Sequence, residues 1–263
     1  MHWRVFFASA TGKHHLDSDA PCQDAGHHLV VDGTFVGVVC DGAGSAAEGQ
    51  AGADFFSRTV AGLLAEELPA AIGGALAPAD RPGGSAPAGP NALRAELLAV
   101  LGQARERLAR IAGERGLGLR DFACTLVGCV VGRAGGCFFH IGDGFGVFTR
   151  QDGCSVVSLP ENGEYSDETF FVTDEGWEDH LRITPLAGVG QGSMIGLMTD
   201  GASPFAIDRT RTGFFRPFID PVVKFLRNAA DPDGNRALQG VLEDEKTFAI
   251  TADDKTLLLA LAG

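Results

Sequence analysis

Residues 29–45 read LVVDGTFVGVVCDGAGS, and this stretch decides the fold. Two apolar runs, 29–31 and 35–40, flank the pair Asp32-Gly33. An Asp-Gly pair between apolar runs is a strong signal for a two-residue hairpin turn, so we expect two antiparallel strands here. The second run stops at Asp41-Gly42, which places a carboxylate at the end of an apolar strand.

The period of the apolar residues changes beyond this hairpin. Helical spacing predicts a helix from Gly49 onward and a second helix over 92–112, whose apolar stripe includes Ile111 and leaves Arg94 and Arg105 off it. Other patterns predict helices at 214–230 and 236–245, and strands at 3–8, 125–131, 137–141, 145–149, 155–159, 169–173, 194–198 and 256–262. Many strands with helix-rich insertions and no regular βαβ alternation indicate an α+β layered fold.

Residues 73–90 are dominated by Gly, Ala and Pro. This composition is typical of a flexible loop or of an interdomain linker. An amphipathic helix follows it rather than a new domain, so we expect a flexible loop between two helices of a single domain, 1–263.

Composition and charge exclude several classes of function. The chain carries 34 acidic and 21 basic side chains, a formal net charge of -13, which argues against a nucleic-acid partner. No apolar run approaches the roughly 18 residues that span a bilayer, so we expect no membrane contact and a cytoplasmic location. None of the six cysteines forms a CxxC pair, which argues against structural zinc.

Aspartates recur where apolar runs stop or start. They are Asp24, Asp41, Asp143, Asp200 and the pair Asp253-Asp254. Strand ends are rigid, and carboxylates are the ligands that Mg²⁺ and Mn²⁺ prefer. Any one Asp-Gly pair is most simply a β-turn, and the sequence does not show which strand ends are neighbours. Their repetition nevertheless predicts a site for divalent cations.

The segments around these aspartates also form an ordered set of motifs. In chain order they are Gly12-Lys13-His14-His15, Pro21-Cys22-Gln23-Asp24-Ala25, Val39-Cys40-Asp41-Gly42-Ala43-Gly44-Ser45, Cys124-Thr125-Leu126, His140-Ile141-Gly142-Asp143-Gly144, Met198-Thr199-Asp200-Gly201 and Asp253-Asp254-Lys255-Thr256. The set resembles the PPM (protein phosphatase 2C-type) family of metal-dependent serine/threonine phosphatases, and looks closest to a bacterial branch. Order and spacing together make the resemblance specific.

The resemblance implies a four-layer αββα sandwich, in which antiparallel helix pairs flank two antiparallel sheets. It implies two Mg²⁺ or Mn²⁺ ions, with Asp41 bridging them and Asp200 and Asp253 completing one. The Gly42 carbonyl and Gln23 would serve the other ion. In the same family layout Asp24 would hold a metal-bound water, Asp143 would either support a third ion or be a plain turn residue, and Trp177 would lie in a flap over the site.

The chain departs from the family at the opening motif, which comprises residues 12–15 and 21–25. Gln23 stands where the family more often has Glu, and a neutral amide is a weaker ligand for a hard cation. No Arg stands just before Gln23-Asp24 to hold the substrate phosphate. His15 is the expected substitute, as a charge-assisted donor, against the alternative of a surface histidine. Asp24, Asp41 and His15 are thus the candidate catalytic residues.

The main hypothesis is a phosphatase that hydrolyses phosphoserine and phosphothreonine in proteins by attack of a metal-bridging water. Its partners would be phosphorylated proteins, among them a serine/threonine kinase or its target. Gln23 and the missing Arg keep a second hypothesis open, a weak or inactive phosphatase-like module that binds a phosphoprotein. A third hypothesis is a hydrolase for a small phosphorylated metabolite.

Overall fold

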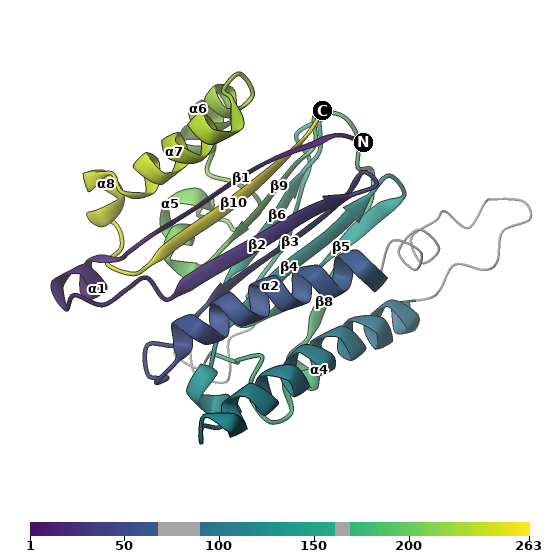
Figure 1. Cartoon of the computed structure of the whole chain (residues 1–263). Helices are drawn as coiled ribbons and strands as arrows, with labels where there is room; N and C mark the ends of the chain where they lie inside the picture. The colour runs from purple at the N-terminus through teal and green to yellow at the C-terminus, as the bar shows by residue number, and fades with distance from the viewer. Residues whose placement is uncertain (68–89, 161–168) are drawn as a thin grey trace, which may run out of the picture.

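A computed structural model describes residues 1–67, 90–160 and 169–263, which build two antiparallel five-stranded sheets (Figure 1). The first sheet has the order β1-β10-β9-β6-β7 and the second the order β2-β3-β4-β5-β8. The strands are β1 (Trp3–Ala10), β2 (Asp24–Val31), β3 (Thr34–Asp41), β4 (Leu126–Gly132), β5 (Gly135–Ile141), β6 (Phe145–Thr149), β7 (Ser155–Ser158), β8 (Arg182–Leu186), β9 (Met194–Met198) and β10 (Lys255–Ala262).

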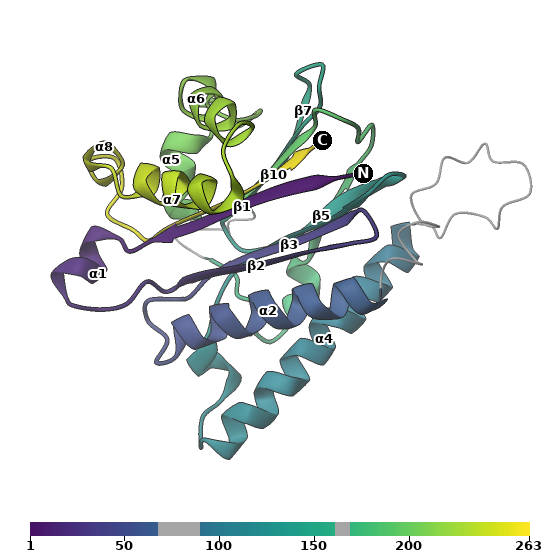
Figure 2. The same ribbon diagram turned by 45° about the horizontal axis from the view of Figure 1, so that its top comes forward.

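Helices cover the outer faces of both sheets, as Figures 1 and 2 show. On the second sheet lie α2 (Gly49–Glu67) and α4 (Pro90–Glu114), and on the first lie α5 (Ser203–Ala206), α6 (Arg216–Leu226), α7 (Asp231–Leu242) and α8 (Glu245–Phe248). The other helices within the described residues are α1 (Lys13–Asp17) and the 3₁₀ turns η1 (Leu119–Phe122), η2 (Trp177–His180) and η3 (Asp200–Ala202). The predicted α+β sandwich is confirmed.

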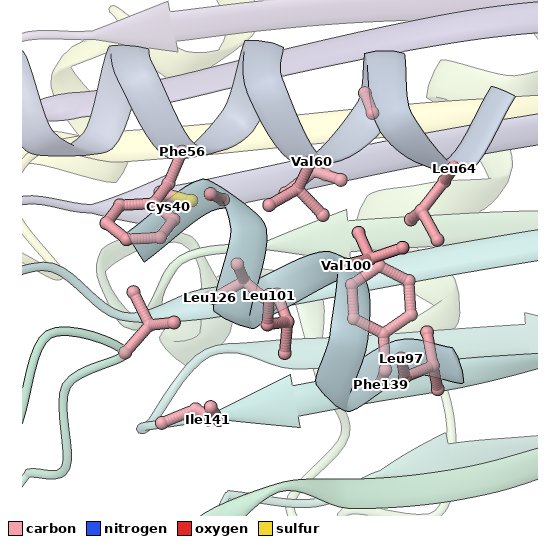
Figure 3. Close-up of a cluster of buried hydrophobic side chains, with 14 of the residues drawn as sticks. Cys40, Phe56, Val60, Leu64, Leu97, Val100, Leu101, Leu126, Phe139 and Ile141 are labelled. Carbon is pink, nitrogen blue, oxygen red and sulfur yellow. The ribbon is translucent and has the colours of Figure 1, made fainter. Parts of the chain in front are cut away.

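The apolar strands are buried on both faces, which explains why their sequences are continuous apolar runs. In β10, Leu257 and Leu259 pack toward the outer helices, whereas Leu258 and Ala260 pack between the sheets. In β3, Cys40 and its alternate neighbours face α2 and α4, where Phe56, Leu101 and Phe139 join them (Figure 3). Because successive side chains of a strand point to opposite faces, each apolar strand contributes both to the core between the sheets and to the core under the helices.

The predicted hairpin is confirmed: β2 and β3 pair from Asp24↔Asp41 to Val31↔Thr34. Asp32 and Gly33 both have positive φ, 50° and 77°, as a two-residue turn of this type requires. The loop expected at 73–90 lies outside the described residues, apart from Pro90, which begins α4. Within the described ranges, no helix is both long and apolar enough to cross a bilayer.

Several sequence-based predictions were wrong. Residues 169–173 form no strand, because the chain turns at Val172-Thr173, where the Asp174 amide donates to the Phe171 carbonyl at 3.1 Å. Ile111 is 41% exposed, and Ala112 takes the buried position in its place. Trp177 lies in the helix-side core at 5% exposure rather than in a flap over the site. The short strand β8, which contains Pro185, was not predicted.

Candidate active site

The strand-end aspartates meet at one end of the two sheets. Asp24 opens β2 and lies directly across from Asp41 at the end of β3. Asp200 follows β9, and Asp253 precedes β10, which pairs with β9 in the other sheet. Asp143 follows β5. Because neighbouring antiparallel strands bring the end of one beside the start of the next, the carboxylates gather where both sheets end.

Burial and the charges of neighbouring carboxylates raise the pKa values of Asp41 and Asp200. For Asp41 the pKa lies well above its usual range, because of burial first and then of the charges on Asp24, Asp200, Asp253 and Asp143. Burial, followed by the charges of Asp143 and Asp253, raises the pKa of Asp200 to about 6. A cation bound between these carboxylates would offset their repulsion and lower their pKa values.

A cavity of about 330 Å³ opens at this end of the sheets. Six predicted site residues line it: His15, Gln23, Asp41, Gly42, Asp143 and Asp253. Asp24 and Asp200 are not among its lining residues, although their charges act on Asp41. The structure therefore brings all the predicted residues into one neighbourhood, six of them on the cavity surface.

The backbone around Asp41 is held rigidly. The Thr125 amide donates to the Asp41 carbonyl at 2.8 Å, and the Asp41 amide donates to Thr125 Oγ1 at 3.1 Å. The next amide, of Gly42, donates to the Gln23 carbonyl at 3.2 Å. A Cβ at Gly42 would lie 2.5 Å from the backbone of Gly49, so only glycine fits this approach.

Asp24 is buried behind the cavity and is positioned by threonines. Thr199 Oγ1 donates to Asp24 Oδ2 at 2.7 Å and accepts from the Thr256 amide at 3.1 Å. Burial is the main cause that raises the pKa of Asp24 to about 8. Thr199 joins Asp24 on β2 to the other sheet, a role that the sequence reasoning did not assign.

Asp254 organises the loop that carries the opening motif. Its side chain accepts from the Gly12 amide at 2.6 Å, from the Gln23 amide at 2.5 Å and from His15 Nδ1 at 2.9 Å. The residue is 2% exposed. Sequence reasoning gave a role to Asp253 alone, and the doubled Asp before β10 was the signal that could have indicated the second. His15 is thus anchored by a buried carboxylate and still lines the cavity.

The donor atoms can be compared with what a divalent cation needs. Oδ1 of Asp24, Asp143 and Asp200 is buried and receives no hydrogen bond from any described residue. Within residues 1–67, 90–160 and 169–263, no three His, Cys, Asp or Glu side chains are arranged to hold one ion. Mg²⁺ usually binds through one or two carboxylates and several waters. The set fits a hydrated cation, and joint coordination by Asp41, Asp200 and Asp253 stays a prediction.

Two stacked antiparallel sheets lie between helix layers, and a cavity lined by several carboxylates opens at one end of them. The chain belongs to the protein phosphatase 2C family, whose model matches residues 11–243. The predicted family and the predicted enzyme class, a phosphoprotein phosphatase, are confirmed, and this family depends on Mg²⁺ or Mn²⁺.

Similar proteins extend over the whole chain. The chain is 29% identical to serine/threonine-protein phosphatase 3 of Escherichia coli (strain K12), over 99% of both chains. The serine/threonine phosphatase of S. agalactiae has a similar structure, with a TM-score of 0.64, 11% identity and full coverage of both chains. PppA, a key regulatory component of T6SS in Pseudomonas aeruginosa, has a TM-score of 0.57 and 21% identity, over 100% of this chain and 99% of that one. At these identities the two structures support the fold alone.

Proposed function

We propose that the chain is a Mg²⁺- or Mn²⁺-dependent protein serine/threonine phosphatase that hydrolyses phosphoserine and phosphothreonine. One observation carries the proposal: carboxylates from both sheets lie around one cavity, and burial together with their charges raises the pKa of Asp41. Such clustering is costly unless a cation compensates it. The E. coli relative, a serine/threonine phosphatase by name, supports the substrate class.

Each residue then has a proposed role. Asp41, Asp200 and Asp253 would hold one ion, and Asp41, the Gly42 carbonyl and Gln23 would hold a second. Ions bound there would lower the pKa of a water and neutralise the phosphoryl oxygens. Asp24, fixed by Thr199, would hold a water at the cavity, and Asp143 would support a third ion.

His15 is proposed to bind the substrate phosphate. Its Nδ1 contacts the buried Asp254 carboxylate at 2.9 Å, which fixes the ring and leaves Nε2 as the nitrogen that could reach a phosphate. Because Asp254 also holds the Gln23 amide, the phosphate contact and the second ion would share one support. This arrangement would compensate for the Arg that the opening motif lacks.

The alternative is a phosphatase-like module that binds a phosphoprotein without turnover, and Gln23 keeps this alternative open. In either case we propose that the partners are phosphorylated proteins, among them a serine/threonine kinase or its target. The cytoplasmic location stays a prediction.

The test is hydrolysis of p-nitrophenyl phosphate during a Mn²⁺ titration. We expect wild-type turnover to rise with Mn²⁺ and Asp41→Asn to lose it, whereas Asp17→Asn, which removes an exposed carboxylate in α1, should keep it. No wild-type turnover at millimolar Mn²⁺ would refute the enzyme. Phosphothreonine peptides then test the substrate class: binding without cleavage would favour the module, and cleavage of aryl phosphate alone would favour a small-molecule hydrolase.

A further inference from the structure

A segment that runs from Thr169 into η2 crosses one side of the cavity. Thr169 and Phe171 line the cavity together with Asp143. Thr169 Oγ1 donates a hydrogen bond to Asp143 Oδ2 at 2.7 Å. The other oxygen of that carboxylate, Oδ1, is buried and receives no hydrogen bond from the described residues. One hydrogen bond therefore orients Asp143 and leaves its second oxygen available to a ligand.

The peptide of Val172 ties this segment to the strands that carry the site. Its amide donates to the Cys124 carbonyl at 3.0 Å, and its carbonyl accepts from Arg105 Nη1. Cys124 directly precedes Thr125, which holds the backbone of Asp41. Val172 is thus fixed on both sides, three residues from Thr169.

Two arginines of α4 hold the same segment from outside. The Arg105 guanidinium lies 5.3 Å from the centre of the Trp177 ring. Arg94 donates to the carbonyls of Leu181 at 2.7 Å and Glu178 at 2.6 Å. Positions 94 and 105 are about three helical turns apart, so both side chains leave the same face of α4. The charges that lie off the apolar stripe in the sequence therefore anchor the segment beside the cavity.

We propose that Thr169 is a positioning residue for cation binding at Asp143, and that Arg105 on the outer helix keeps Thr169 in place. The proposal rests on the proposed function only for the kind of ligand, a divalent cation. A carboxylate that must rotate before it binds a cation loses affinity, and removal of the hydrogen-bond partners of metal ligands typically weakens binding about 10- to 100-fold.

The direct test is Mn²⁺ binding by the full chain, with free Mn²⁺ measured by electron paramagnetic resonance. We expect Thr169→Val to weaken one Mn²⁺ site about tenfold. Thr169→Ser keeps the hydroxyl and should restore binding. Asp143→Asn should weaken the same site, and adding Thr169→Val to it should change nothing more, because both changes act on one carboxylate.

The outer helix is tested in the same assay. Arg105→Met should weaken the same Mn²⁺ site, whereas Arg110→Met, an exposed arginine of the same helix, should leave it unchanged. Circular dichroism checks that each variant is folded, and if Arg105→Met does not fold, the Thr169 variants decide. Equal Mn²⁺ binding by wild type and Thr169→Val would overturn the proposal. So would additive effects with Asp143→Asn, or a wild type that binds no more Mn²⁺ than Asp143→Asn.

Phosphatase assays of the same samples separate this proposal from the proposed function. A wild type without turnover, combined with weaker Mn²⁺ binding in Thr169→Val, would sink the phosphatase and support the positioning role. Wild-type turnover, combined with unchanged Mn²⁺ binding in Thr169→Val, would support the phosphatase and refute the positioning role.

Discussion

Replacing Asp254 by Asn should loosen the loop of the opening motif and destabilise the whole protein. The carboxylate accepts three hydrogen bonds at 2% exposure, from the Gly12 amide on Oδ1 and from the Gln23 amide and His15 Nδ1 on Oδ2. An amide has the same shape but only one oxygen. Whichever way the substituted side chain turns, its NH₂ group then faces at least one backbone N–H that has lost its acceptor.

The magnitude follows from this count. The less costly orientation keeps the oxygen toward Gln23 and His15 and loses the bond from Gly12. A hydrogen bond to a charged group contributes about 1.5–3 kcal/mol, and the two that remain would have a neutral acceptor. We therefore expect the free energy of unfolding to fall by about 3 kcal/mol, which corresponds to a decrease in Tm of about 6–12 °C for a chain of this size.

Urea denaturation followed by tryptophan fluorescence measures the change. The two tryptophans, Trp3 and Trp177, are each 5% exposed, one between the sheets and the other under α4, so they report on both layers. Asp17→Asn is the matched control, because it removes an exposed carboxylate. If Asp254→Asn and Asp17→Asn both unfold within about 0.5 kcal/mol of wild type, the role assigned to Asp254 is wrong.

Three further predictions concern pH, backbone approach and helix propensity. Burial raises the pKa of Asp24 from 3.8 to about 8. Between these two pH values the metal-free native state keeps a proton that the unfolded chain releases. The free energy of unfolding should therefore fall as the pH rises from 3.8 to about 8. Asp24→Asn should flatten this slope in Tm measurements in EDTA, and an unchanged slope would contradict it. Gly12→Ala places a Cβ 2.2 Å from the Asp253 backbone, so aryl phosphate turnover should drop at least about tenfold, and near-normal kinetics would show that the loop can move. Gly102→Ala, in open space within α4, should raise stability by about 0.5–1 kcal/mol in urea, and a loss would point to an unseen contact.

Local patterns in the sequence were enough to predict an α+β layered fold, and the family resemblance supplied its four layers. Asp32-Gly33 specified the β2–β3 hairpin, and the apolar spacing from Gly49 specified α2. These signals act between residues close in the chain, where turn chemistry and periodicity decide the structure. The order of strands was beyond such reasoning, because β10 pairs with β1 across almost the entire chain.

The site residues likewise divide into those that local sequence patterns indicated and those that depend on the tertiary fold. Asp41, Asp200 and Asp253 could be chosen because each stands at the end of an apolar run. The doubled Asp before β10 pointed to Asp254 as well, but its role, like that of Thr169, depends on contacts made through space. Asp254 accepts from Gly12, which is 242 residues away, and Thr169 reaches Asp143 from a segment that the sequence suggested was a strand. Side-chain partners of this kind follow from the tertiary fold and leave no periodic trace.

The position of β10 has a consequence for how the molecule is made. This strand lies between β1 and β9, and Asp254 at its start supplies the acceptor that the Gly12 and Gln23 amides need. A nascent chain synthesised only as far as α7 would therefore have β1 without its neighbour and no support for the first loop. The earlier aspartates would already be present, yet the cavity could not assemble. Catalytic competence is thus coupled to completion of the first sheet, and partly synthesised chains should not dephosphorylate proteins.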